Sequence, residues 1–174
     1  MSDRQDVRRV GITDLGRSPV MWLAFGFGTG LSPKAPGTVG TLPGILLGWL
    51  LVTVAAPWGD AATIGLLLAV TAGLSLVGFY LCGEASRRLG VHDHGGIVFD
   101  EIVGVLPVFI VLPEAWWELA LIFAWFRLFD VIKPWPINWL DRRVGGGVGI
   151  MVDDLLAGAY ALPATWGTLL VIGG

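Results

Sequence analysis

Residues 61–82 read A-A-T-I-G-L-L-L-A-V-T-A-G-L-S-L-V-G-F-Y-L-C, a run without a single charged side chain. A helix needs about 20 mainly apolar residues to cross the hydrocarbon core of a bilayer, so this run predicts a membrane-spanning helix. Of the 174 residues, 55% are hydrophobic and 14% are charged, against about 25% charged in typical soluble domains. The mean hydropathy is +0.74. We therefore expect an integral membrane protein, and the net charge of −3 argues against a nucleic-acid partner.

Four further stretches, read outward from this run, also predict membrane spans. They lie within residues 35–59, at about 97–113, at about 116–134 and from about 150 to 174. The apolar segment 18–31 is too short to cross and ends in alternating glycines, so it predicts an interfacial or re-entrant helix. The expected fold is all-α, an integral membrane helical bundle with about five spans plus this N-terminal helix. It forms a single domain over residues 1–174, with a polar N-terminal tail at residues 1–17.

The positions of the eleven Lys and Arg residues predict the orientation of the bundle. They fall before the first span, at the end of the fourth span, and in the loops after the second and fourth spans. The opposite loops, around Asp60 and residues 114–118, contain none. Because cytoplasmic loops carry the excess of Lys and Arg, we expect a cytoplasmic N-terminus. The N-terminal sequence has no signal-peptide core, so we expect no cleaved targeting segment. The polar clusters then converge on the cytoplasmic ends of the spans, as for a site built between helices.

Two acidic pairs lie in the first turns of the third and fifth spans. They are Asp100 with Glu101, and Asp153 with Asp154. Buried carboxylates cost several kcal/mol unless a cation, a proton or hydrogen bonds compensate them. Because adjacent helical residues diverge by about 100°, we expect one member of each pair to face the bundle and the other a loop or solvent. Dense carboxylate oxygens suit Mg²⁺, which also bridges to substrate phosphate; the alternative is pairing with nearby arginines.

Other polar residues join these pairs at the same membrane face. For His94, in a glycine-rich loop, a role as base, acid or ligand and a surface or capping role both stay open. Arg127 and Asp130 are spaced to pair with each other, but an arginine inside a lipid-facing helix is costly, which favours phosphate binding or a buried pair serving the site. Thr38 and Thr41 stand at a helix start, where free N–H groups and the dipole favour anions, although capping alone also explains them.

Together these residues indicate a Mg²⁺-dependent enzyme acting on a phosphorylated lipid headgroup at the cytoplasmic surface. The D-x-D-x-[TV], C-x₅-R and D-x₂-D-G-x₂-A-R motifs of other phosphate-transfer enzymes are missing. Ser86 and Arg87 begin the S-R-x₅-H pattern of acid-phosphatase-type lipid phosphatases, but Asp93 stands where that pattern requires histidine. A competing class, a small ion-coupled transporter, predicts polar residues across the membrane midplane. The centres of the second, third and fifth spans carry no charge.

Four blocks of sequence resemble one family, the phosphatidylglycerophosphatase A family. They are L-S-P-K-A-P-G-T-V-G-T-L (31–42), G-V-H-D-H-G-G-I-V-F-D-E (90–101), F-R-L-F-D-V-I-K-P-W-P-I (126–137) and D-R-R-V-G-G-G-V-G-I-M-V-D-D (141–154). Their order and spacing match the family over about residues 26–161. The resemblance implies an all-helical, Mg²⁺-dependent phosphatase of the bacterial inner membrane. Its substrate would be phosphatidylglycerophosphate and its products phosphatidylglycerol and inorganic phosphate.

The resemblance also implies a set of site residues. It carries over Thr38, His94, Asp100, Glu101, Arg127, Asp130, Lys133, Asp141, Arg142, Asp153 and Asp154. We expect the metal ligands among the two acidic pairs, and Arg127 with Lys133 as an electrostatic clamp on the phosphate. Thr38 and Arg142 are further candidates for substrate binding, and His94 or a spare carboxylate for general acid–base work. A covalent aspartyl-phosphate route, and phosphotransfer to another lipid, stay open as alternatives.

Overall fold

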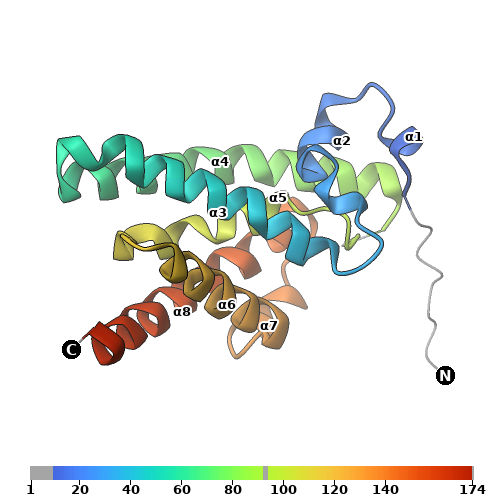
Figure 1. The fold of residues 1–174 in the computed structure, drawn as a ribbon. Coiled ribbons are helices and arrows are strands. Elements are labelled where there is room, and N and C mark those ends of the chain that lie inside the picture. Colours follow the sequence, from blue (N-terminus) through green and yellow to red (C-terminus); the bar gives the residue numbers. More distant parts are fainter. Residues whose placement is uncertain (1–9, 92–93, 174) are drawn as a thin grey trace.

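The protein is described from a computed structural model, which covers residues 10–91 and 94–173. Within these ranges the regular structure is entirely helical, which confirms the all-α prediction. The α-helices are α1 (Ile12–Leu15), α2 (Pro19–Ala24), α3 (Pro36–Ala55), α4 (Asp60–Leu89), α5 (Phe99–Gly104), α6 (Trp116–Ile132), α7 (Ile137–Asp141) and α8 (Gly146–Gly173). Three short 3-10 helices are η1 (Gly26–Leu31), η2 (Ala56–Trp58) and η3 (Leu106–Val111). Figure 1 shows the long helices α3 and α4 side by side above α6 and α8.

Among the residues that the structure describes, three helical stretches are long and apolar enough to cross a membrane. They are Pro36–Trp58, Asp60–Leu89 and Gly146–Ile172, with 23, 30 and 27 residues. At 1.5 Å per residue each exceeds the roughly 30 Å of bilayer hydrocarbon. These stretches correspond to the first, second and fifth predicted spans. The fourth, α6, has 17 residues, which rise only about 26 Å.

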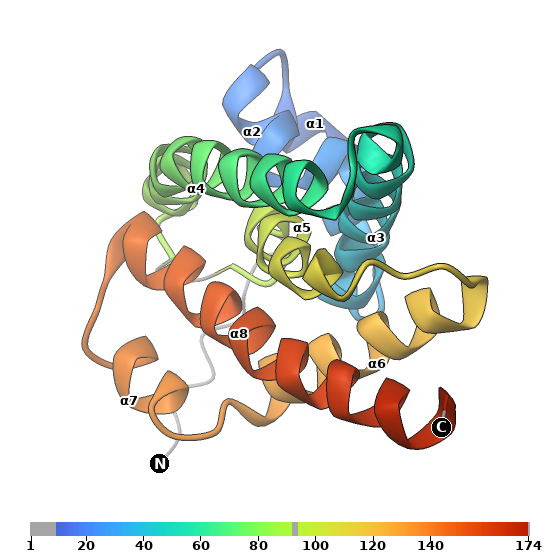
Figure 2. The ribbon, with the colours of Figure 1, turned by 90° about the vertical axis from the view of Figure 1, so that its left-hand side faces the viewer.

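The third predicted span is not a continuous helix, which corrects the expectation for residues 97–113. After the six residues of α5 the chain continues as the 3-10 helix η3, with Pro107 in its first turn. Proline lacks an N–H and disfavours the α conformation of the residue before it, so the α-helix ends there. Figure 2 shows this segment enclosed by α3, α4, α6 and α8, and Val105, Leu106 and Phe109 are fully buried. Irregular backbone is tolerated at membrane depth when protein surrounds it in this way.

Glycines bring α8 close to its neighbours. A Cβ at Gly147 would overlap the carbonyl oxygen of Phe79 on α4, and one at Gly158 would overlap the carbonyl oxygen of Gly104 on α5. Small residues permit such backbone approach between membrane helices. The last span was expected to begin at about residue 150, but α8 already begins at Gly146. The close approach of Gly147 to α4 explains why a glycine stands in the first turn of this helix.

The N-terminal segment forms three short helices, α1, α2 and η1. This confirms the prediction that residues 18–31 are not a membrane-spanning helix. Ser18 caps α2 by accepting a hydrogen bond from the N–H of Met21, and Pro19 starts the helix. Gly26, Phe27 and Gly28 all have positive φ angles, which turns the chain sharply into η1. The segment lies against the last turns of α4 (Figure 1). It therefore covers the end of the bundle at which the predicted site lies.

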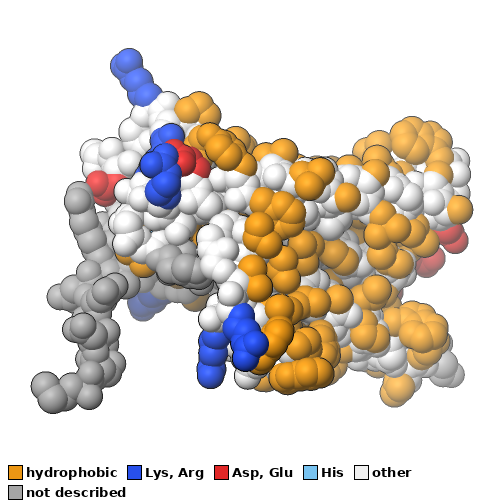
Figure 3. All heavy atoms as spheres, turned by 180° about the vertical axis from the view of Figure 1, so that it is seen from behind, with side chains coloured by type: hydrophobic (Ala, Val, Ile, Leu, Met, Phe, Trp, Pro, Cys, Tyr) orange, Lys and Arg blue, Asp and Glu red, His pale blue; other side chains and the backbone are white. Residues whose placement is uncertain are grey.

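Charged side chains gather at the ends of the molecule. Figure 3 shows an apolar band between an end rich in Lys and Arg and an opposite end where acidic side chains appear. Asp60 and Glu114 line one pocket at that opposite end. The arginines Arg87 and Arg88 lie in the last turn of α4, and Lys133 follows α6. This division agrees with the loop assignment on which the predicted orientation depends.

Candidate metal and phosphate site

Three carboxylates from two helices form one cluster. Asp100 and Glu101 come from the first turn of α5, and Asp154 comes from α8. One carboxylate oxygen from each lies within 4.8 Å of the other two. Asp100 and Asp154 are buried, with 8% and 3% of their surface exposed. We call Asp100, Glu101 and Asp154 the carboxylate cluster.

Two glycines allow the helices to meet at this cluster. A Cβ at Gly104 of α5 would lie 2.7 Å from the Cβ of Asp154, so the two helices touch beside the cluster. A Cβ at Gly37 would overlap Oε1 of Glu101, so the start of α3 lies directly against that carboxylate. Neither glycine was among the predicted site residues. The sequence offered only one indication of their role, which is that Gly37 and Gly104 lie close to Thr38 and to the Asp100–Glu101 pair.

The two acidic pairs behave differently from one another. Asp100 and Glu101 both join the cluster, so the expectation that adjacent residues must diverge is wrong for this pair. Side chains on a helix lean toward its N-terminus. The longer Glu101 side chain can therefore reach the cluster although its Cα–Cβ bond points away from that of Asp100. Asp153 and Asp154 do diverge, as expected from the 100° rotation per residue. Only Asp154 faces the cluster.

Asp153, predicted among the metal ligands, instead contacts Lys133. Its Oδ2 accepts a hydrogen bond from Nζ of Lys133, and its Oδ1 accepts one from the N–H of Asp154 at 3.1 Å. Asp141 adds a second carboxylate 3.3 Å from Nζ of Lys133. Burial disfavours the ammonium, but the hydrogen bonds and charges of Asp153 and Asp141 outweigh it and raise the pKa of Lys133 above its usual value. Lys133 is therefore held by two acids beside the cluster.

Arg127 connects α6 to the cluster. Its Nη1 donates to Oδ2 of Asp130 and lies 3.8 Å from Oε1 of Glu101. The predicted pair with Asp130 forms, and the guanidinium also faces Glu101, while phosphate binding by Arg127 stays a prediction. Its side chain is 17% exposed, and its Nε has no hydrogen-bond partner among the described residues. Through its bond to Asp130, Arg127 connects this acid to the edge of the cluster.

The residues present fit a hard divalent cation. Oε2 of Glu101 and Oδ2 of Asp154 are buried and have no hydrogen-bond partner within residues 10–91 and 94–173. Buried acceptors without partners cost free energy, and one nearby arginine cannot neutralise several carboxylates. The three acids offer only oxygen donors, which Mg²⁺ prefers. The chemistry of the cluster therefore fits a Mg²⁺ ion, and the predicted binding of Mg²⁺ stays a prediction.

The other predicted residues lie around the cluster rather than in it. Thr38 is in the first turn of α3, next to Gly37, and is half-buried. Thr41 donates to the carbonyl oxygen of Gly37 at 2.8 Å, so a bond within its own helix explains it. His94 is buried and its Nδ1 accepts a hydrogen bond from the N–H of Gly96 at 3.0 Å. The prediction that His94 is an acid or base stays a prediction.

Arg142 is exposed at the end of α7 and stays a predicted contact for substrate. Its neighbour Arg143 stacks over the ring of Trp139, with 4.5 Å between the guanidinium carbon and the ring centroid. Such a pairing of charge and aromatic ring is typical of a membrane interface. The loop between α6 and α8 thus presents cations at the same end as the cluster.

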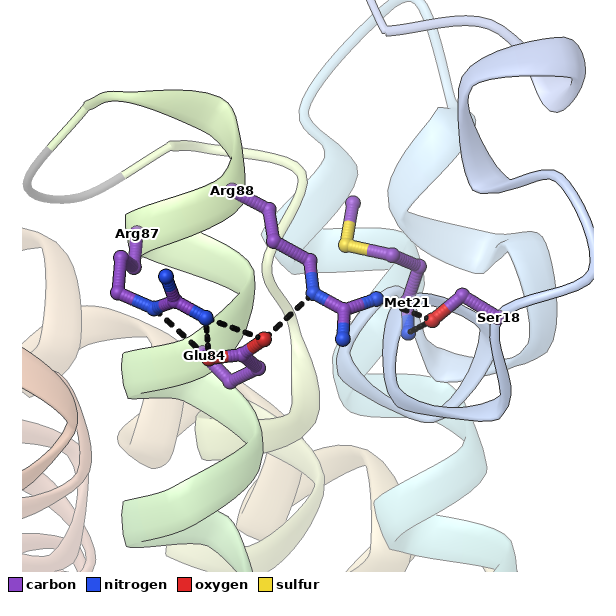
Figure 4. Close-up of polar contacts among 5 residues, drawn as sticks. All are labelled: Ser18, Met21, Glu84, Arg87 and Arg88. Atoms are coloured by element: carbon purple, nitrogen blue, oxygen red, sulfur yellow. Dashed lines mark hydrogen bonds and ion pairs between the residues drawn. The ribbon is translucent and has the colours of Figure 1, made fainter.

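An ion-pair network that the sequence analysis missed holds the N-terminal segment against α4. Glu84 accepts hydrogen bonds from Arg87 and from Arg88, at 2.7 Å and 2.6 Å (Figure 4). Arg88 also donates to the hydroxyl of Ser18 at 2.6 Å, so the network reaches the cap of α2. The i,i+3 and i,i+4 spacing of the charges was visible in the sequence. The partner on α2, 70 residues away in the chain, was not.

Comparisons with known proteins agree on one family. The family model for Phosphatidylglycerophosphatase A matches residues 22–169. The chain is 40% identical to Phosphatidylglycerophosphatase A of Haemophilus influenzae, with 93% of each protein covered. It is 45% identical to the Escherichia coli protein of the same name, with 83% of this chain and 80% of that protein covered.

A further relative carries a different name. A putative phosphatidylinositol-3-phosphatase of Bacteroides thetaiotaomicron is 35% identical, over 82% of this chain and 88% of its own length. No solved structure matches the chain. The family model nevertheless covers most of the sequence, including the carboxylate cluster and Arg127. The chain belongs to the phosphatidylglycerophosphatase A family.

Proposed function

We propose that this protein is a Mg²⁺-dependent lipid phosphatase that removes the terminal phosphate of phosphatidylglycerophosphate. The products are phosphatidylglycerol and inorganic phosphate. Two relatives that carry the name of this activity are similar over most of the chain. The observation that carries the mechanism is the buried carboxylate cluster beside Arg127.

Asp100, Glu101 and Asp154 would hold the metal. When bound, Mg²⁺ supplies an activated water and neutralises charge on the phosphate. Asp130 would support the cluster by holding Arg127 beside Glu101. The burial of these acids favours the metal-bound state, because no solvent competes for their oxygens.

Arg127 and the start of α3 would bind the phosphate. Arg127 is held in place by Asp130, which orients a planar donor group well suited to phosphate oxygens. The first N–H groups of α3, at Gly37 and Thr38, have no partner within an α-helix by their position and favour an anion. Donors fixed before the reaction stabilise the charge that develops in the transition state. Thr38 adds a hydroxyl in the same turn.

Lys133 would act from a position next to the carboxylate cluster rather than within it. Its ammonium lies between Asp153 and Asp141, so it adds positive charge beside the cluster while fixing the rotation of α8. Asp154, next to Asp153 on that helix, is then held toward α5. For Lys133 to contact the substrate phosphate directly, as predicted from the sequence, its ammonium would have to give up one of its ion pairs with Asp153 and Asp141.

We place the reaction at the cytoplasmic face of the bacterial inner membrane. The clusters of Lys and Arg lie at the same end of the bundle as the carboxylate cluster. The excess of basic residues on one side favours a cytoplasmic position for that side. The substrate then reaches the site from the membrane in which the helices lie.

The test is phosphate release from phosphatidylglycerophosphate by the purified protein in detergent micelles, with Mg²⁺ or with EDTA. EDTA should abolish release, and Asp154→Asn should do so at any Mg²⁺ concentration while the protein stays inserted. Asp60→Asn, at the opposite end of the bundle, is the matched control and should keep wild-type turnover. EDTA-resistant release, or no release by the wild type, contradicts the proposal.

The name of the Bacteroides relative motivates a second substrate in the same assay. Phosphatidylinositol 3-phosphate, tested beside phosphatidylglycerophosphate, shows which headgroup the protein prefers. A labelled terminal phosphate that appears on another lipid, rather than in solution, indicates phosphotransfer. Movement of ions without phosphate release supports the transporter alternative.

A further inference from the structure

A groove on the surface of the N-terminal segment has no role in the proposed function. It has a volume of about 590 Å³ and is lined by Gly16, Arg17, Pro19, Trp22, Leu23 and Phe27. These residues come from the loop before α2, from α2 itself and from the start of η1. Among the described residues, those that line the groove include the cation of Arg17 and no acid. The groove therefore offers apolar surface together with a positive charge.

The charge of Arg17 is available to a ligand. The side chain is exposed, and within residues 10–91 and 94–173 it forms no ion pair with an acid. Trp22, by contrast, already uses its polar atom, because its Nε1 donates to the carbonyl oxygen of Gly16 at 3.0 Å. The indole ring thus offers apolar surface to the groove, while Arg17 is left to bind a polar group. This combination fits an amphipathic anion.

Phe27 is held outward by the turn between α2 and η1. Its side chain is 75% exposed, whereas Phe25 is fully buried. Its φ of 56° is in the left-handed region, which is costly for a residue other than glycine. The N–H groups of Gly28 and Gly30 both donate to the carbonyl oxygen of Phe25, at 2.9 and 3.1 Å, and fix the turn. A strained residue that exposes a large apolar ring indicates a binding surface.

The contact between α2 and α4 indicates the depth of the groove in the membrane. The 30 residues of α4 rise about 45 Å, which matches the hydrocarbon core together with both headgroup regions. Arg88, in the last turn of α4, is therefore at headgroup level, and its Nη1 donates to the hydroxyl of Ser18 at 2.6 Å (Figure 4). In Figure 3 hydrophobic side chains lie next to Lys and Arg side chains at the basic end of the molecule. The groove, which begins next to Ser18, thus lies where acyl chains meet headgroups.

We propose that this groove binds an anionic phospholipid of the surrounding leaflet, with the headgroup phosphate on Arg17 and an acyl chain against Trp22 and Phe27. Basic residues at a membrane surface attract anionic headgroups, and aromatic rings are favoured at the boundary between acyl chains and headgroups. A zwitterionic headgroup would bring its own cation toward Arg17, so an anionic one is preferred. The volume is within the range of small-molecule sites. The proposal goes beyond the phosphatase activity and does not depend on it.

Photo-crosslinking from position 27 identifies the occupant. The full-length protein with Phe27→benzoylphenylalanine, which keeps an aromatic ring, is placed in vesicles of equal parts phosphatidylglycerol and phosphatidylcholine with EDTA present. Mass spectrometry should find about fivefold more phosphatidylglycerol adduct, the effect of one basic residue at an anionic surface. Arg17→Gln should reduce this preference to the composition of the vesicle. Lys34→Gln removes another exposed cation, outside the groove, and as the matched control should keep the preference.

Three results of this experiment would overturn the proposal. Equal adducts of the two lipids would show that the groove does not select an anion. A preference that survives in Arg17→Gln would show that another group holds the headgroup. Adducts to protein alone, whether to a second copy or to the chain's own residues 1–9, would give the groove a different occupant.

A nitroxide label tests independently whether position 27 lies in lipid. The single cysteine, Cys82, is buried, so Phe27→Cys in a Cys82→Ala background provides one labelling site. In the same vesicles, oxygen should relax this nitroxide more strongly than a water-soluble nickel chelate does. Leu76→Cys, exposed midway along α4, provides the reference for hydrocarbon. A nickel effect at position 27 that equals or exceeds that of oxygen would place it in water and contradict the proposal. Neither test requires turnover, so both stand whatever the enzyme's substrate.

Discussion

The backbone of Gly37 lies directly against the carboxylate of Glu101, with no space for a Cβ between them. The contact joins the first turn of α3 to the first turn of α5. It also lies beside Arg127, whose Nη1 would be 3.2 Å from such a Cβ. One glycine thus allows three helices to share the site.

Gly37→Ala should inactivate the enzyme without unfolding it. Alanine is the better helix former by about 1 kcal/mol, so the thermal midpoint in detergent should hold or rise. The methyl group displaces Glu101 from the carboxylate cluster, and a misplacement of about 1 Å can cost about 100-fold in turnover. Gly65→Ala on α4, where a Cβ meets nothing within 4 Å, is the control. Equal turnover in both variants would show that catalysis does not depend on the position of the Glu101 carboxylate in the cluster.

Arg127→Lys should lower kcat by about 100-fold or more while leaving metal affinity near that of the wild type. Lysine keeps the charge but loses the fork of donors that binds phosphate oxygens and Asp130 together. Phosphate release at saturating Mg²⁺ measures kcat, and a Mn²⁺ titration measures the affinity. A kcat within tenfold of the wild type would reduce Arg127 to a structural partner of Asp130.

The ion pair of Lys133 and Asp153 should stabilise the fold as a coupled unit. Lys133→Met leaves a buried carboxylate without its cation, and should cost about 1–3 kcal/mol, discounted for the partial exposure of Lys133. Asp153→Asn in the same background should cost much less than it does alone, because the partner is already gone. Unfolding midpoints of the two single variants and the double variant give the coupling. Additive effects would mean that the pair is not energetically coupled.

The pH dependence of this pair has a definite sign. The pKa of Lys133 is higher in the folded protein than in the unfolded chain, although burial alone would lower it. Its contribution is therefore fully present below the unfolded value of about 10.4 and is lost as pH rises through the folded value. The stability difference between wild type and Lys133→Met should be constant from about pH 7 to 9 and shrink only in strong alkali. A change near neutral pH would point to another titrating group.

The sequence predicts the parts of the fold that depend on long apolar runs. The α3, α4 and α8 spans follow from uncharged stretches of about 20 residues or more, which only a helix can carry through a bilayer. The break at Pro107 was not predictable, because a proline can also sit in a kinked continuous helix. Nor could the sequence show that α8 begins at Gly146, since glycine suits both a loop and a close helix contact.

The site was predictable in its composition but not in its geometry. Charge in apolar helices marked both acidic pairs and Arg127 as functional. Which member of a pair faces the cluster depends on the rotation of α8, and a helix that is apolar nearly all round carries no periodicity to fix it. The pairing of Asp153 with Lys133 and the approach of Gly37 to Glu101 are tertiary contacts between distant segments. They became visible only in three dimensions.

The most direct test of the account is the binding of Mn²⁺, as a stand-in for Mg²⁺, to the purified protein measured by electron paramagnetic resonance. The wild type should bind the ion and release it to excess Mg²⁺. Asp154→Asn should weaken binding by at least about tenfold, because the site loses a charged ligand. Asp60→Asn at the far end of the bundle should bind as the wild type does. Unchanged affinity in Asp154→Asn, or no saturable binding by the wild type, would contradict the assignment of the carboxylate cluster as the metal site.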